Sequence, residues 1–173
     1  KNPEAILGAF SILARRDDMK DVNLVLAGSG WKNEDVEGMI EREGLSGRVI
    51  FTGFTPEEDV VGLYNNAEVF VFPSRAEGYG MPNVEAMACG CPVVTSRSFA
   101  IPEIVGDAAL MIDDPDDHAD LAGKIARIMT DRAFRDTLAE KGLAWVKRYS
   151  WDASARTIIG VYRELAGPGA GRP

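Results

Sequence analysis

The sequence predicts a doubly wound α/β domain built on a parallel sheet. Short apolar runs alternate with helical patterns along almost the whole chain, and polar or glycine-containing turns separate them. The chain has 173 residues, 46% of them hydrophobic, which is enough to bury the core of one domain of ordinary size. Because strands that alternate with helices become neighbours in a parallel sheet, we expect helices on both faces of that sheet.

The first helix is predicted from the start of the chain, where an apolar face is made by Ile6, Leu7, Phe10, Ile12 and Leu13. The remaining elements follow in strict alternation up to residue 112. We expect strands at residues 22–27, 49–51, 69–72, 93–95 and 109–112. We expect helices at residues 31–43, 56–65, from about Met81 or Pro82 onward, and at 102–105, 116–130, 131–149 and 151–165.

The final predicted helix carries one apolar face, made by Trp151, Ala155, Ile158, Ile159, Tyr162 and Leu165. Two interpretations stay open: the face packs against this domain, or it is exposed and covered by another domain or another copy. The tail at residues 167–173 is rich in glycine and proline, and we expect it to be disordered.

The segment from Pro73 to Val94 holds the most informative residues. It places Glu77 in a loop after an apolar strand and Glu85 about one turn into the next helix. Gly78 and Gly80 let the backbone approach a ligand closely, and the positive end of the helix favours an anion such as a diphosphate. Carboxylates are common partners of sugar hydroxyls, so two of them beside an anion site suggest a nucleotide-sugar.

This segment resembles the signature of retaining glycosyltransferases of the GT-B architecture, family 4 (glycosyl transferases group 1). Further matches extend the resemblance over almost the whole chain, at residues 49–54, 63–64, 102–109 and 113–115. The resemblance implies the C-terminal, Rossmann-like donor-binding half of such an enzyme. It implies that Glu77 is the catalytic residue contacting the hydroxyls of the donor sugar and that Glu85 binds the ribose.

The resemblance also indicates the other donor-binding residues. Around the two glutamates these are Gly78, Tyr79, Gly80, Met81 and Asn83. Gly28 and Gly30 form a strand-to-helix turn near the donor, although a plain turn is an equal alternative. Phe54 would adjoin the nucleobase or be an ordinary packed aromatic residue. Lys1 resembles a lysine that contacts the diphosphate, or it is a solvated terminal side chain.

The resemblance predicts that residues 1–166 form a nucleotide-sugar binding domain lacking its first strand. In the family that strand is central in the sheet, so its neighbours would have unpaired edges here. Either the chain begins inside the domain or the strand is supplied otherwise. The acceptor-binding N-terminal domain lies outside this chain, and this half alone should transfer nothing.

Composition excludes several classes. The net charge of −8 argues against nucleic acid as a partner. Cys89 and Cys91 lack the spacing of a zinc site. We expect both to be small buried residues with free thiols, which fits a reducing cytoplasm. We expect His118 to lie on the surface. We expect no metal, no cofactor and no direct membrane insertion. The expected substrate is a UDP-, GDP- or ADP-sugar, and a membrane-peripheral full-length enzyme is compatible with this.

Two other functions are compatible with parts of this sequence. Another GT-B enzyme, of the glycogen or starch synthase type or the nucleotide-sugar epimerase type, would share the fold but usually departs from this signature. A non-catalytic interaction module would not need both Glu77 and Glu85. The sequence therefore favours a retaining glycosyltransferase and leaves its base, sugar and acceptor open.

Overall fold

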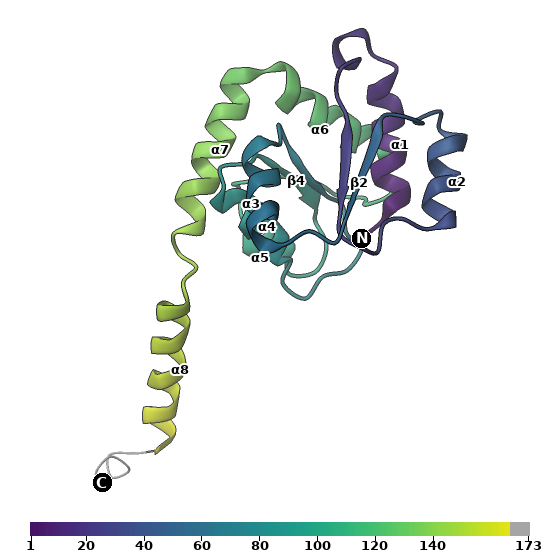
Figure 1. Cartoon of the computed structure of the whole chain (residues 1–173). Helices are drawn as coiled ribbons and strands as arrows, with labels where there is room; N and C mark the ends of the chain where they lie inside the picture. Colours follow the sequence, from purple (N-terminus) through teal and green to yellow (C-terminus); the bar gives the residue numbers. More distant parts are fainter. Residues whose placement is uncertain (167–173) are drawn as a thin grey trace.

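The computed structural model describes residues 1–166, and Figure 1 shows their arrangement. Helices and strands alternate as predicted. The elements are α1 (Pro3–Ala14), η1 (Asp17–Met19), β1 (Leu24–Ala27), α2 (Glu34–Arg42), β2 (Val49–Gly53), α3 (Glu57–Asn66), β3 (Phe70–Phe72), α4 (Met81–Ala88), β4 (Val93–Ser96), α5 (Ile101–Val105), β5 (Leu110–Ile112), α6 (His118–Thr130), α7 (Arg132–Val146) and α8 (Trp151–Ala166).

All strand pairs of the described chain are parallel, and they fall into two sheets. One sheet joins β1 to β2, with Leu24 opposite Val49. The other has the order β3, β4, β5, with Phe70 opposite Val93 and Val94 opposite Leu110. The doubly wound α/β class is thus confirmed, and its sheet is interrupted between β1 and β3.

Helices cover both faces of the three-stranded sheet, as a doubly wound fold requires. Val93 and Val94 are adjacent in β4 and point to opposite faces because side chains alternate along a strand. Val94 belongs to the core formed with α1, α2 and α6, whereas Val93 belongs to the core formed with α4 and α5. Every residue of β4 is buried, so this strand is the centre of the core.

The interruption leaves β1 and β3 each with an unpaired edge. The amide of Leu24 donates to the carbonyl of Arg48, just before β2, and the amide of Gly28 donates to the carbonyl of Gly53, at the end of β2. Because successive backbone N–H groups point to opposite edges of a strand, those of Val25 and Ala27 point away from β2. The amide of Phe70 likewise donates to the carbonyl of Pro92, just before β4, so the backbone N–H of Val71 points toward the interruption. Each of the two strands thus has one edge without a strand partner among residues 1–166, and the missing first strand stays a prediction.

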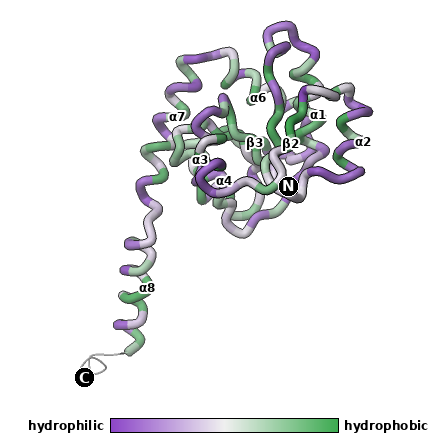
Figure 2. The backbone as a smooth tube through the Cα atoms, in the orientation of Figure 1, coloured by the Kyte–Doolittle hydropathy of each residue, from purple (hydrophilic) through white to green (hydrophobic). Residues whose placement is uncertain are grey.

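Helix α8 projects away from the body of the molecule (Figure 1), and none of its residues, all of them described, is buried. Figure 2 shows apolar positions along this isolated helix as well as along α1 and β2 in the body. Packing of the last helix against this domain was one of two interpretations, and it is wrong. Within residues 1–166, no helix combines the length and the apolar character needed to cross a bilayer.

The ends of several elements differ from the sequence-based bounds. The second helix begins at Glu34 rather than residue 31, because the Asn33 side chain caps it by accepting from the amide of Val36. The seventh helix ends at Val146 rather than residue 149. The short helix η1 was not predicted. The expected tail at residues 167–173 lies outside the described residues.

Candidate functional site

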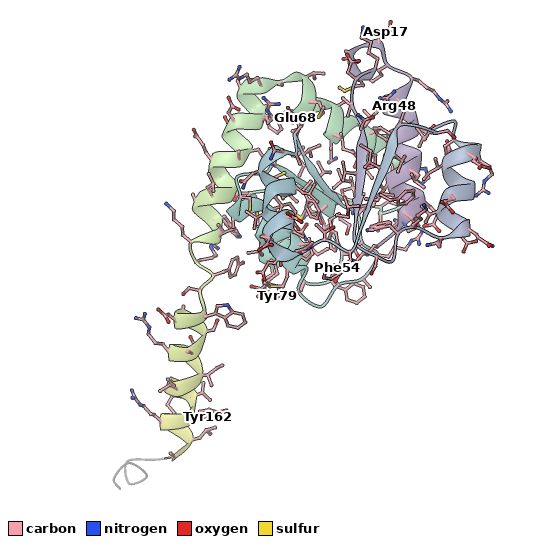
Figure 3. The ribbon with its side chains drawn as sticks, in the orientation of Figure 1. Asp17, Arg48, Phe54, Glu68, Tyr79 and Tyr162 are labelled. Carbon is pink, nitrogen blue, oxygen red and sulfur yellow. The ribbon has the colours of Figure 1, made fainter. Side chains whose placement is uncertain are left out.

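The expected site residues gather at the edge where the parallel strands end. Arg48 and Glu68 precede β2 and β3, and Figure 3 shows both in the upper part of the molecule. Phe54 and Tyr79 follow the same two strands, and both are drawn at the lower edge of the body. The N-terminus lies at this lower edge as well (Figure 1). Loops from separate parts of the chain therefore meet where open α/β sheets bind ligands.

Glu77 lies in the loop between β3 and α4 and is half-buried. The hydroxyl of Ser74 lies 3.0 Å from its carboxylate Oε1 and 3.2 Å from the carbonyl oxygen of Ala76, so its one proton is shared between these two acceptors. Ser74 itself is 1% exposed, and its carbonyl accepts a hydrogen bond from the hydroxyl of buried Ser96 in β4. The carboxylate of Glu77 is thus attached through Ser74 to the central strand of the core.

The turn before α4 leaves the N-terminus of this helix without a side-chain cap among the described residues. Gly80 is the N-cap residue with φ of 79° and ψ of 44°, a left-handed conformation that favours glycine. Within residues 1–166 no side chain caps this helix, so the N–H of Met81 and the positive end of α4 remain open. Gly78 does not adopt a positive φ, so only the second of the two predicted glycines needs this backbone freedom.

Asn83 occupies the first turn of α4 but is fully buried. Neither its Nδ2 nor its Oδ1 atom has a hydrogen-bond partner among the described residues. A Cβ atom at Gly80 would come within 2.9 Å of Asn83 Nδ2, so the amide lies directly beneath the turn. Asn83 was predicted to bind the donor, and with both polar atoms of its side chain unpaired beneath the turn this stays a prediction.

Glu85 is exposed on α4 and is approached by a residue from another helix. The hydroxyl of Tyr64 in α3 donates to its Oε2 atom over 3.3 Å. The ring of Tyr64 packs edge-on against Phe70, with 5.2 Å between ring centroids. Burial, followed by the charge of Glu85, raises the pKa of Tyr64, so its hydroxyl keeps its proton and remains a donor.

A hollow of about 440 Å³ brings Lys1, Gly28 and Gly30 together beside Trp31. The amide of Gly28 donates to the carbonyl of Gly53 over 3.0 Å, which places this hollow next to the loop that carries Phe54. Phe54 is 81% exposed, so the alternative of an ordinary packed aromatic residue is wrong. Four predicted donor-binding residues thus share one end of the two-stranded sheet.

An ionic cluster ties the start of the chain to this edge. Arg75, in the loop after β3, donates to Asp116 over 2.8 Å and lies 3.7 Å from Glu4. Asn2 donates to Asp116 and to the carbonyl of Pro115. The hydrogen bond from Arg75, followed by that from Asn2, lowers the pKa of Asp116. This cluster holds the N-terminus of α1 between the loops that follow β3 and β5.

Sequence reasoning missed Ser74, Tyr64 and Trp31 as site residues. Ser74 and Tyr64 stand in the segments that carry the family resemblance, but nothing local shows that their hydroxyls reach Glu77 and Glu85. Trp31 directly follows the Gly28–Gly30 turn, and an aromatic residue next to a glycine turn is the signal by which the sequence could have indicated it.

Tyr79 is 40% exposed and contacts the ring of Tyr149, with 6.2 Å between the ring centroids. This contact joins the glycine turn to the end of α7.

The fold and the site define an α/β domain of the kind that binds ligands at the carboxyl ends of parallel strands. Residues 1–145 match the family model described as glycosyl transferases group 1, and the chain belongs to this family. This confirms the family part of the resemblance and the glycosyltransferase, GT-B-type assignment.

Relatives with known names agree with that assignment. The chain is 36% identical over 166 residues to O-antigen chain mannosyltransferase B of Escherichia coli, covering 95% of this chain and 43% of the relative. It is 33% identical to D-inositol 3-phosphate glycosyltransferase of Corynebacterium jeikeium, covering 95% and 41%. The chain thus spans less than half the length of these relatives.

Solved structures show the same fold. The domain is similar to sucrose-phosphate synthase of Thermosynechococcus elongatus, with a TM-score of 0.81 and 31% identity over 95% of this chain and 42% of that one. It is also similar to Anabaena HepE in complex with UDP-glucose, with a TM-score of 0.73 and 25% identity over 84% and 40%. Both comparisons support the α/β fold of GT-B glycosyltransferases.

Proposed function

We propose that this chain is the donor-binding half of a glycosyltransferase that transfers a sugar from a nucleotide-sugar to an acceptor with retention of configuration. The observation that supports the proposal is the order of residues along the chain, with Glu77 in the loop before α4, Gly80 at its N-terminus without a side-chain cap, and Glu85 one turn into the helix. Two carboxylates around one anion site match the two sugars and the diphosphate of a nucleotide-sugar.

Each part of the donor then has a partner in this proposal. Glu85 accepts from the ribose hydroxyls, and Glu77, the catalytic residue, accepts from hydroxyls of the transferred sugar. The N-terminus of α4 and Lys1 stabilise the diphosphate, whose negative charge grows as it leaves. The exposed ring of Phe54 offers an apolar surface to the base. The complex of the relative HepE with UDP-glucose supports a nucleotide-sugar as the ligand class.

The proposal includes two parts beyond the described residues. A further strand fills the interruption between β1 and β3, because the facing edges of both strands are unpaired. An acceptor-binding domain faces the donor site and covers the apolar residues of α8, since the relatives are more than twice as long as the match. On this proposal the chain by itself binds the donor and transfers no sugar.

The test is a thermal-shift screen with UDP, GDP and ADP, each alone and as a sugar conjugate, on the natural polypeptide that carries this chain. A ligand of the folded state raises the melting temperature by mass action. We expect one nucleotide to raise it and Glu85→Ala to abolish most of that rise. The matched control is Glu37→Ala, which removes an exposed glutamate from α2.

The outcomes separate the competing functions. A shift that survives Glu85→Ala would contradict the ribose role. The absence of a shift with every nucleotide would favour a non-catalytic interaction module. Turnover of a nucleotide-sugar without an acceptor sugar would favour an epimerase over a transferase.

A further inference from the structure

Both carboxylates of the proposed donor site are approached by a hydroxyl group from another part of the fold. Ser74 donates to Glu77 and Tyr64 donates to Glu85. We propose that Ser74 and Tyr64 are positioning residues, which orient the two glutamates toward the sugar hydroxyls before the donor arrives. This inference rests on the proposed function, because it assigns the two glutamates to the two sugars.

Ser74 is attached rigidly to the core. It is 1% exposed, and its carbonyl accepts from Ser96, which is itself fully buried in β4. The hydroxyl of Thr95 anchors the preceding strand in the same way, by donating to the carbonyl of Phe72 over 2.8 Å. The backbone of Ser74 is therefore fixed by the core, and a carboxylate that accepts from its Oγ atom is held in one orientation.

Tyr64 acts from a different helix. Its ring is fixed edge-on against Phe70, so the position of the hydroxyl follows from packing against β3. The hydrogen bond reaches Oε2 of Glu85 and leaves Oε1 available to a ligand. The 3.3 Å separation is long for a bond to a carboxylate, and such bonds commonly shorten when the substrate binds.

The contacts are better explained by function than by stability. Glu85 is exposed, so water can satisfy its carboxylate without help from the protein. A hydrogen bond to an exposed carboxylate adds little to folding, whereas it restricts the rotamers of a side chain that must meet its ligand in one orientation. The effect should therefore depend on the ligand. Loss of either hydroxyl should weaken the binding only of ligands that contain the sugar contacted by the glutamate which that hydroxyl orients.

The test is calorimetric titration of the natural polypeptide that carries this chain, with UDP, GDP and ADP and with UDP-glucose, GDP-mannose and ADP-glucose. Tyr64→Phe keeps the packed ring and removes only the hydroxyl. We expect it to weaken binding of the nucleoside diphosphate and of its sugar conjugate alike, by roughly three- to tenfold. Its effect should vanish with the 2′,3′-dideoxyribose analogue and in a Glu85→Ala background.

Ser74→Ala should behave differently. We expect it to leave the affinity for the nucleoside diphosphate unchanged and to weaken binding of the nucleotide-sugar by roughly three- to tenfold. Ser74→Thr keeps a hydroxyl at this position and should restore part of the affinity. The matched control is Ser46→Ala in an exposed turn, which should change neither affinity.

Three results would overturn the inference. Unchanged affinity in both variants shows that the hydroxyls do not matter. Equal weakening of nucleotide and nucleotide-sugar by Ser74→Ala, with a lowered melting temperature, shows a structural role. Persistence of the Tyr64→Phe effect with the dideoxyribose analogue shows that Tyr64 does not act through the ribose carboxylate. By contrast, a wild-type protein that binds none of the six ligands overturns the proposed function itself, before any variant is compared.

Discussion

At the scale of single residues, burial decides the chemistry of the two thiols. Cys91 is 3% exposed and packs against α4 and β4, whereas Cys89 is partly exposed at the end of α4. Burial raises the pKa of the Cys91 thiol to about 12. The expectation of two buried cysteines is therefore confirmed for Cys91, and Cys89 is more accessible than expected.

This pKa predicts how stability depends on alkaline pH. The folded chain keeps the Cys91 proton to a higher pH than the unfolded chain, whose thiol has the ordinary value of 9.0. The contribution of the protonated Cys91 thiol to the free energy of unfolding is therefore complete below pH 9, and it is lost as the pH rises toward 12. We expect the unfolding free energy of the wild type, measured by urea denaturation, to fall more steeply over this range than that of Cys91→Ala. The difference should approach about 1.4 kcal/mol per pH unit at most.

Cys89→Ala is the control for that measurement. The thiol of Cys89 is closer to the surface than that of Cys91, so its removal should change the slope of the unfolding free energy against pH less. Parallel curves for the wild type and Cys91→Ala would show that Cys91 titrates as it does in the unfolded chain.

At the scale of elements, the end of α7 holds α5 in place. Trp145 Nε1 and the Tyr149 hydroxyl both donate to the carbonyl of Ile104, over 2.7 and 2.8 Å. The Trp145 ring lies over Gly106, where an added Cβ atom would come within 2.1 Å of it. Since Tyr149 also meets Tyr79, this packing joins α7, α5 and the glycine turn of the site.

Gly106→Ala should therefore be strongly destabilising. Gly106 has φ of 55° and ψ of −129°, which disfavours an L side chain, and the hydrogen-bonded tryptophan ring leaves no space for a methyl group. Strain and overpacking together predict a loss of roughly 2–5 kcal/mol in the free energy of unfolding, measured by urea denaturation.

The matched control is Gly123→Ala, at an exposed interior position of α6 where no atom lies within 4 Å of the added methyl group. Alanine is the better helix former, so we expect this variant to be unchanged or stabilised by up to about 1 kcal/mol. A Gly106→Ala variant as stable as the wild type would mean that Trp145 moves aside without penalty.

At the scale of the whole molecule, the interruption of the sheet and the projecting helix α8 set the behaviour of this chain. The centre of the core is β4, which pairs on both sides and is buried on both faces. The edge of β1 that faces the interruption has no strand partner among residues 1–166, and Val25 in this strand is 43% exposed. A structure with an unpaired inner edge should open locally at that edge first.

Amide hydrogen exchange should reveal this difference. We expect the amides of Val25 and Val71 to exchange at least roughly a hundredfold faster than that of Thr95 in the 173-residue chain. In the natural polypeptide that carries this chain, the proposed additional strand should slow exchange at Val25 and Val71 while Thr95 stays slow. Fast exchange at Val25 in both proteins would contradict that proposal.

The sequence by itself determined the local features of this protein. The alternation of elements, the start of α4 at Met81 and the positions of Glu77 and Glu85 around it follow from hydrophobic periodicity and from a glycine turn. These signals act over a few residues, so they can be read without the fold. The ends of α2 and α7 were less well predicted, because caps and packing decide where a helix stops.

Tertiary structure alone decided which residues meet. Tyr64 and Glu85 are 21 positions apart, and Ser96 lies 22 positions from Ser74, so only the packing of α3 and β4 around the site brings them together. The same holds for the burial of Asn83, the exposure of Phe54 and the unpaired edges of β1 and β3. Such contacts depend on how distant elements pack in three dimensions, and no local pattern in the chain encodes them.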